Sequence, residues 1–184
     1  MRIYISGGAK NGKSMYAQTV AKNLSDEGHL WYLATMEPHD DEDYARIARH
    51  RKERAGWGFK TAEWGRDIEL HGNEIDNEGT FLVDSVTAIL TNEMFGDMNG
   101  EINSSAVDKT VNELLFLAQK AKNVVFVSDN IFCDAKRFDK WTDAFLKGLA
   151  ETDRKISKSC DVIAEFCCGN IIFYKGEELI EKTD

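Results

Sequence analysis

Eight consecutive residues near the start of the chain have the types and order needed to hold a triphosphate. They fit the pattern GxxxxGK[ST] and are Gly7, Gly8, Ala9, Lys10, Asn11, Gly12, Lys13 and Ser14. In such a loop, backbone amides of the glycine-rich turn surround phosphate oxygens, and the start of the following helix adds partial positive charge. The Lys13 ammonium would reach the β- and γ-phosphates, and the Ser14 hydroxyl would bind Mg²⁺. A glycine-rich turn that matches by chance is the alternative, which the flanking apolar and amphipathic runs disfavour.

A carboxylate further along the chain would complete this site. Asp84 ends the apolar run Phe81-Leu82-Val83, where a Walker-B carboxylate holds Mg²⁺ through its hydration shell. The alternative is an ordinary aspartate that caps the next element after a strand. Together the two motifs predict a P-loop protein that binds a magnesium–nucleotide triphosphate, with Lys13 as a catalytic residue and Ser14 and Asp84 as the metal-binding residues.

The rest of the chain alternates short apolar runs with longer amphipathic ones, which predicts strands alternating with helices. The expected strands are Arg2–Ser6, Leu30–Thr35, Phe59–Glu63, Thr80–Asp84 and Asn123–Ser128. The expected helices are Lys13 to about Glu27, Asp40–Arg54, Ala106–Lys120 and Phe138–Ser157, with a polar loop at Gly96–Ser104 and a terminal hairpin of Asp161–Phe166 and Asn170–Lys175. This order predicts the α/β class: a P-loop NTPase fold with a mostly parallel sheet, helices on both faces and a C-terminal hairpin. Ligands of such folds bind beyond the carboxyl ends of the strands.

Composition narrows the class of protein. The chain has 184 residues and no Pro- or Ser-rich linker, so residues 1–184 are expected to form one nucleotide-binding domain. A net charge of −9 disfavours broad, sequence-independent binding to nucleic acid. No window approaches the roughly 18 consecutive apolar residues of a membrane helix, and the start lacks the pattern of a secretory signal. The cysteines, which lack CxxC spacing, favour a cytoplasmic protein with reduced thiols over a zinc site; they are Cys133, Cys160, Cys167 and Cys168.

An ordered series of short motifs follows the phosphate loop. Tyr32-Leu33-Ala34-Thr35 is followed by an acidic turn at Asp40–Asp43, by Arg46-Ile47-Ala48-Arg49-His50, by Trp57, by Thr61-Ala62-Glu63 and by Leu82-Val83-Asp84 with Thr87 and Asn92 beyond it. In this order and spacing, the chain resembles the bifunctional adenosylcobinamide kinase/adenosylcobinamide-phosphate guanylyltransferase family of cobalamin biosynthesis. The resemblance is strong over the first half of the chain and loose over the second. The acidic turn could suggest a metal site, but its place at a helix start favours capping.

The resemblance implies an enzyme with two activities: phosphorylation of adenosylcobinamide with ATP or GTP, and transfer of GMP from GTP to the product. It implies that His50 is the nucleophile and that the guanine nucleotide lies among a defined set of residues. These are Ala34, Thr35, Met36, Arg51, Lys52, Glu53, Arg54, Glu63 and Asp84. It also implies a corrinoid substrate, Mg²⁺ and a homotrimer.

The chemistry of His50 is consistent with that role. A neutral imidazole nitrogen can attack the α-phosphorus of GTP, expel pyrophosphate and form a phosphoramidate, which splits the transfer into two displacements. Basic neighbours such as Arg46, Arg49 and Arg51 could stabilise charge on the phosphates. The alternative is a solvated helical histidine. Glu63 could accept hydrogen bonds from the guanine N1–H and amino group, or it could be an ordinary surface charge.

The second half departs from the family pattern at one loop. The pattern VSNEVGxGxVP is replaced by Val127-Ser128-Asp129-Asn130-Ile131-Phe132, with no proline after it. Asn130 stands where the pattern has a glutamate, and an amide takes no proton at neutral pH. A divergent member, altered on the cobinamide side or in one activity, is therefore one hypothesis. The others are a P-loop kinase of another small hydroxylated metabolite, with His50 merely structural, and a nucleotide-binding regulatory protein with degraded catalysis.

Overall fold

The structure is a computed structural model that describes residues 1–38, 40–96, 102–132 and 138–180. Of the helical residues Arg46 and Glu53, only the backbone is described. Its strands are β1 (Arg2–Gly7), β2 (Leu30–Ala34), β3 (Lys60–Ala62), β4 (Thr80–Asp84), β5 (Asn123–Asp129), β6 (Val162–Cys167) and β7 (Asn170–Lys175). Its helices are α1 (Lys13–Leu24), α2 (Asp41–Glu53), the short 3₁₀ helix η1 (Ile68–His71), α3 (Val86–Phe95), α4 (Ala106–Lys120), α5 (Lys140–Ser157) and α6 (Glu177–Ile180).

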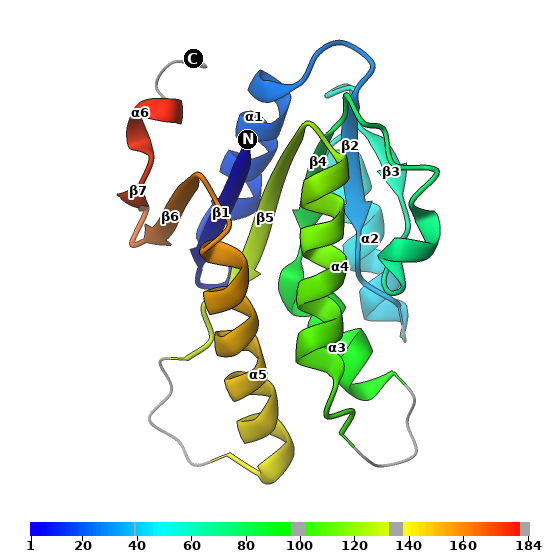
Figure 1. The fold of residues 1–184 in the computed structure, drawn as a ribbon, viewed down its shortest axis with the longest axis vertical. Helices are drawn as coiled ribbons and strands as arrows, with labels where there is room; N and C mark the ends of the chain where they lie inside the picture. The colour runs from blue at the N-terminus through cyan, green and yellow to red at the C-terminus, as the bar shows by residue number, and fades with distance from the viewer. Residues whose placement is uncertain (39, 97–101, 133–137, 181–184) are drawn as a thin grey trace.

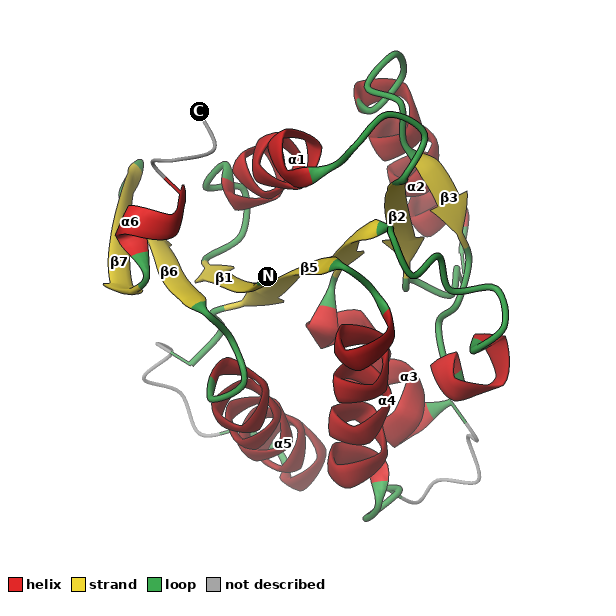
Figure 2. Ribbon diagram, turned by 45° about the horizontal axis from the view of Figure 1, so that its top comes forward, coloured by secondary structure: helices red, strands yellow, loops and turns green. Residues whose placement is uncertain are grey.

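The strands form a sheet in the order β3-β2-β4-β5-β1-β6-β7. All neighbouring strands are parallel except β6 and β7, which form the expected antiparallel hairpin at the C-terminal end. Figure 2 shows α1 on one side of the sheet, α3, α4 and α5 on the other, and α2 near the β2–β3 edge. The predicted α/β class, parallel sheet and two-sided helical cover are confirmed.

The central strands are apolar on both faces, as a sheet covered on both sides requires. On β5, Val124 and Phe126 belong to the core that α4 covers, whereas Val125 and Val127 belong to the core that α1 covers. All four side chains are fully buried. The side chains of β5 thus alternate strictly between the two helical layers, and this alternation also decides where the polar residue at its end points.

Helix α3 was not predicted, and its burial explains why. Most of its residues are buried, including Ile89, Leu90 and Asn92. A helix that is buried over most of its surface lacks the polar stripe that marks an amphipathic helix in sequence. Ser85 caps it, since the Ser85 hydroxyl accepts a hydrogen bond from the Ala88 amide at 3.2 Å. The short η1 and α6 were not predicted either, and most of the expected Gly96–Ser104 loop lies outside the described residues.

The parallel strands place four chain segments at one edge of the sheet. β1, β2, β4 and β5 end at Gly7, Ala34, Asp84 and Asp129, and the phosphate-loop motif follows β1 directly. Figure 1 shows these strands running side by side in the same direction. The fold therefore brings together the motifs that the sequence separates by more than a hundred residues. In the described part of the chain, every helix is too short or too polar to cross a membrane.

Candidate active site

A cavity of about 980 Å³ opens at this edge of the sheet. Its lining comes from the glycine-rich loop, from the ends of β2, β4 and β5, and from the C-terminal part of α2. Most of the residues selected from the sequence line it: Ala9, Lys10, Asn11, Gly12, Lys13, Ser14, Ala34, Thr35, Met36, His50, Arg51, Arg54, Glu63 and Asp84. Gly7, Gly8 and Lys52 are not among the lining residues, and the side chain of Glu53 is outside the described part of the structure.

The glycine-rich loop has the geometry that its sequence demands. Gly12 has a φ of +96°, which favours glycine, and α1 begins at the next residue. Gly7 has no room for a side chain, because a Cβ there would lie 2.8 Å from the Phe166 carbonyl oxygen of β6. Asn11 fixes the loop by donating to that same carbonyl at 2.9 Å and by accepting from the Lys13 amide at 3.2 Å. The loop is therefore held against the hairpin, with the start of α1 facing the cavity.

Lys13 has two polar partners in the structure. Its ammonium donates to the Gly8 carbonyl oxygen at 3.2 Å and lies 2.8 Å from Oδ1 of Asp129. Only 8% of the Lys13 side chain is exposed, whereas 31% of the Asp129 side chain is. Asp129 lines the cavity but was not selected from the sequence. The signal that would have found it is the register of the sheet, which pairs Asp129 with Gly7, the residue at which the loop begins.

Asp84 is a buried carboxylate at the end of β4. Tyr32 donates its hydroxyl to Oδ2 of Asp84 at 3.2 Å. Burial raises the pKa of Asp84 above its ordinary value, while the electrostatic effect of nearby His50 and the hydrogen bond from Tyr32 act in the opposite direction. His50 and Asp84 both line the cavity, so the imidazole and the carboxylate belong to one site. The Asp84 carboxylate and the Ser14 hydroxyl line the same cavity, and oxygen donors of these two kinds are suited to Mg²⁺.

The C-terminal turn of α2, which carries His50, is attached to the sheet at two points. The Arg54 guanidinium stacks on the Tyr32 ring, 3.4 Å from its centroid, and Arg51 forms an ion pair with Glu63 beyond β3. His50 lies one turn before Arg54, on the same face of the helix. The two arginines therefore hold His50 toward the cavity. At the other end of α2, the Asp40 side chain accepts from the Asp43 amide at 2.9 Å, so the expected capping role of the acidic turn is confirmed.

A buried amide joins two walls of the cavity. Asn92 on α3 donates to the Thr35 carbonyl oxygen at 2.8 Å and to the Gly65 carbonyl oxygen at 2.9 Å. Thr35 in turn donates its hydroxyl to the Ser85 carbonyl oxygen at 3.0 Å and accepts from the Ser85 amide at 2.8 Å. The segments after β2, β3 and β4 are thus tied together below the cavity. The sequence shows Asn92 as part of a motif, but its partners follow only from the fold.

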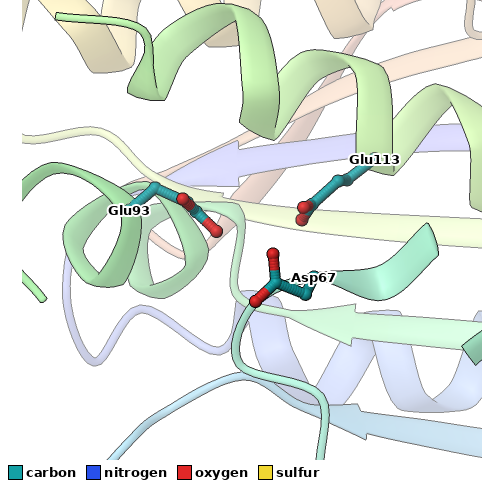
Figure 3. A group of neighbouring side chains, drawn as sticks. All are labelled: Asp67, Glu93 and Glu113. Carbon is teal, nitrogen blue, oxygen red and sulfur yellow. The ribbon is translucent and has the colours of Figure 1, made fainter. Parts of the chain in front are cut away.

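A second group of charges lies outside this cavity. Figure 3 shows Asp67, Glu93 on α3 and Glu113 on α4 pointing toward one another, and a ligand oxygen of each lies within 4.8 Å of the others. The Lys109 ammonium already faces these oxygens, at 2.7 Å from Asp67, 2.9 Å from Glu93 and 3.8 Å from Glu113. The cation that the three carboxylates face is therefore this chain's own lysine.

The fold and the loop define a class before any close relative is considered. A solved ATPase domain superposes on this chain with a TM-score of 0.51 at 11% identity, covering 89% of this chain and 68% of that domain, and the shared fold is that of a P-loop NTPase. The sequence profile of the family described as cobinamide kinase / cobinamide phosphate guanyltransferase matches residues 3–172. The chain belongs to this family.

Curated relatives agree with that assignment. The bifunctional adenosylcobalamin biosynthesis protein CobU of Escherichia coli is 32% identical over 116 residues, which cover 61% of this chain and 62% of the relative. The protein of the same name from Salmonella typhimurium is 29% identical over 143 residues, which cover 71% of this chain and 76% of the relative. The match thus spans a little under two thirds of the Escherichia coli protein.

Proposed function

We propose that this protein phosphorylates adenosylcobinamide with ATP or GTP, and that it transfers GMP from GTP to the phosphorylated corrinoid through a guanylyl–His50 intermediate. Membership of the family supports the reaction class. The observation that carries the proposal is that the phosphate-loop residues, Asp84 and His50 line one cavity. Both activities need a triphosphate, and this arrangement offers one place for it to bind.

Phosphate binding is assigned to the glycine-rich loop and the start of α1. Backbone amides there would surround the phosphate oxygens, and the partial positive charge of the helix start favours an anion. Lys13 would donate to the β- and γ-phosphate oxygens while it keeps its contact with Asp129. Ser14 and Asp84 would hold Mg²⁺, which when bound offsets charge on the phosphates.

The GMP-transfer step is assigned to His50. An unprotonated ring nitrogen attacks the α-phosphorus, a phosphorus–nitrogen bond forms, and the bond to the leaving pyrophosphate breaks. The phosphate of the corrinoid then attacks the same phosphorus and releases the imidazole. Arg51 and Arg54 keep α2 in place, and their positive charge favours the phosphates nearby. Glu63 would accept hydrogen bonds from guanine, in which case its carboxylate must share or leave its ion pair with Arg51.

Mass spectrometry of the intact protein tests the transfer half. After incubation with GTP and Mg²⁺, the wild-type chain should gain one GMP through an acid-labile, base-stable bond. His50→Ala should gain none, and His29→Gln should be labelled like the wild type, because His29 precedes the start of β2 and does not line the cavity at the other end of that strand. Labelling that persists in His50→Ala would contradict the assignment.

The kinase half has a separate test. Wild-type protein, adenosylcobinamide and Mg-ATP or Mg-GTP should give adenosylcobinamide phosphate, and His50→Ala should retain this step because its imidazole serves only the transfer. A chain that labels His50 but leaves the corrinoid unphosphorylated would contradict the bifunctional proposal. The trimer implied by the resemblance remains a prediction, which light scattering on the eluting protein would check.

A further inference from the structure

We propose that Asp129 accepts the proton of the substrate hydroxyl during phosphoryl transfer. The assignment rests on the proposed kinase function and names the residue that would act on its acceptor. It begins from the position of a carboxylate within contact distance of the phosphate-loop lysine, at 2.8 Å from Lys13 Nζ.

The alternation of side chains along β5 determines where this carboxylate points. Val125 and Val127 face the layer of α1, and residue 129 is the next on that side. Ser128 faces the other layer and donates its hydroxyl to Asp153 on α5 at 2.8 Å. A carboxylate at position 129 therefore faces the phosphate loop, whereas one at position 128 would not.

The backbone around Asp129 is held from two sides. Its amide donates to the Thr87 hydroxyl of α3 at 3.0 Å, and the Asn130 amide donates to the Gly7 carbonyl oxygen at 2.9 Å. These bonds attach the end of β5 to α3 on one side and to the beginning of the phosphate loop on the other. A group that must receive a proton during the reaction benefits from such fixed placement.

The contact between Lys13 and Asp129 limits how far this carboxylate would lie from a bound γ-phosphate. If Lys13 donates to a γ-phosphate oxygen at about 2.8 Å, Oδ1 of Asp129 lies at most about 5.6 Å from that oxygen, because its own distance to Lys13 is 2.8 Å. A hydroxyl aligned about 3 Å from the phosphorus can donate to a carboxylate at this range. A negative carboxylate beside a phosphate is repulsive, and the bridging proton of the hydroxyl relieves that repulsion.

The side chain of the next residue, Asn130, is turned toward β6. Asn130, which stands where the family pattern has its glutamate, donates its side-chain amide to Oε1 of Glu165 on β6 at 2.9 Å. The loop is therefore not without a carboxylate in this chain. Asp129 supplies one, from a position that faces the lysine.

In the proposed step, the hydroxyl oxygen of the corrinoid side chain bonds to the γ-phosphorus, and the bond from that phosphorus to the β,γ-bridging oxygen breaks. The nucleoside diphosphate leaves with the bonding electrons. The hydroxyl proton passes to the Asp129 carboxylate and from there to water. General bases of this kind contribute about 10²–10⁴-fold to rate.

The test uses Asp129→Asn in the full chain, with three readouts. We expect kcat for corrinoid phosphorylation to fall by about 10²–10⁴-fold, while the Kd of Mg-ATP stays within threefold of wild type or becomes tighter, because a negative charge has left the phosphate site. The GMP adduct on His50 should still form, which also shows that the variant folds. Asp129→Glu, which keeps the carboxylate, should be at least tenfold more active than Asp129→Asn. Asp153→Asn serves as the matched control, because it removes a carboxylate at the same strand end on the opposite face, and its kcat should stay within threefold of wild type.

Three results would overturn the assignment. The first is a kcat for Asp129→Asn within threefold of wild type. The second is a weakening of nucleotide binding that accounts for the whole loss, since Asp129 would then only position Lys13. The third is recovery of the rate at raised Mg²⁺ concentration, which would make Asp129 a metal-binding group. If the wild-type chain itself does not phosphorylate the corrinoid, the proposed kinase function is wrong and the Asp129 assignment falls with it. This outcome differs from the other three because it appears in the unmodified protein.

Discussion

The cavity around Lys13 and the cluster around Lys109 each combine one lysine with several carboxylates, but they differ in where the charges face. Lys13 and Asp129 line an open cavity of about 980 Å³ together with Asp84. Lys109 faces three carboxylates of α3, α4 and the segment before η1, and 4% of each of the Glu93 and Glu113 side chains is exposed. We therefore propose that a lysine among carboxylates serves binding where the fold leaves space beside it, and stability where the fold leaves none.

This difference has a physical basis in the sheet. The carboxyl ends of parallel strands create a crevice in which a polar group at one strand end has empty space next to it. The Lys109 cluster lies where α3 and α4 pack together, so its charges meet partners from the chain itself. Removing the lysine should therefore abolish binding in one region and reduce stability in the other.

The largest effect is expected for Lys13→Met, which keeps an apolar stem but removes the ammonium. Two charge-assisted hydrogen bonds to phosphate, at about 1.5–3 kcal/mol each, correspond to a loss of about 10²–10⁴-fold in Mg-GTP affinity. The free energy of unfolding should change by less than about 1 kcal/mol, because the partner left behind, Asp129, is partly solvated. Titration calorimetry and urea denaturation measure the two quantities. Affinity within tenfold of wild type would place the triphosphate elsewhere.

The converse effect is expected for Lys109→Met. Three carboxylates within 4.8 Å would lose the ammonium that they face. The free energy of unfolding should fall by about 2 kcal/mol, less than for a fully buried pair, because 37% of the Lys109 side chain is exposed. Mg-GTP affinity should stay within threefold. If affinity fell in step with stability, the two regions would not be independent.

Asn92→Ala tests the buried side chain that joins the cavity walls through α3. The Thr35 and Gly65 carbonyl oxygens would each lose a buried donor, so the free energy of unfolding should fall by about 1–2 kcal/mol. Mg-GTP affinity should fall roughly fivefold, since Thr35 lines the cavity. Thr91→Ala changes an exposed neighbour on the same helix and should leave both quantities unchanged. An effect on stability alone would mean that the cavity keeps its shape without this link.

Most strands and helices could be predicted from the sequence because the patterns that indicate them are local. The apolar run of β4 and the amphipathic pattern of α4 each lie within a few turns of chain, and both elements have the expected bounds. Helix α3 was missed because its burial depends on three other elements packing around it. Its residues lack the alternation of polar and apolar faces that indicates a helix.

The candidate site was predicted where a motif is continuous and missed where it depends on strand order. The phosphate loop is one segment, and His50, which lines the cavity, was selected through its place in an ordered series. Asp129 stands 116 positions after Lys13 in the chain, and only the pairing of β5 with β1 brings them together. The second lysine cluster was missed for the same reason, since Asp67, Glu93 and Glu113 come from three elements that meet only in the fold.

The smallest effect is a change in how the free energy of unfolding depends on pH, and it is the effect most specific to the cluster around Lys109. Burial, followed by the charge of Glu93, raises the pKa of Glu113 to about 7 in the folded chain, above its ordinary value. A raised pKa means that the folded state holds this proton more tightly. The stability that it contributes is therefore present at low pH and is lost as pH rises toward and through about 7. Glu113→Gln should remove about 1 kcal/mol of this decline between pH 5 and pH 8.

In Glu113→Gln the free energy of unfolding should still decline somewhat with pH, because the raised pKa of Asp153 has the same effect. Burial raises the pKa of Asp153 to about 6, and this carboxylate contacts Ser128 rather than the cluster around Lys109. Asp153→Asn should therefore remove the part of the decline that lies below about pH 6, and the double variant should be nearly flat over the range. Urea denaturation of the four proteins at each pH gives the curves. Two results would contradict this prediction: a wild-type stability that rises from pH 5 to pH 8, or a Glu113→Gln curve identical to the wild-type curve. Either result would show that the cluster around Lys109 keeps all its carboxylates ionised. The cluster and the cavity around Lys13 would then differ only in their access to solvent.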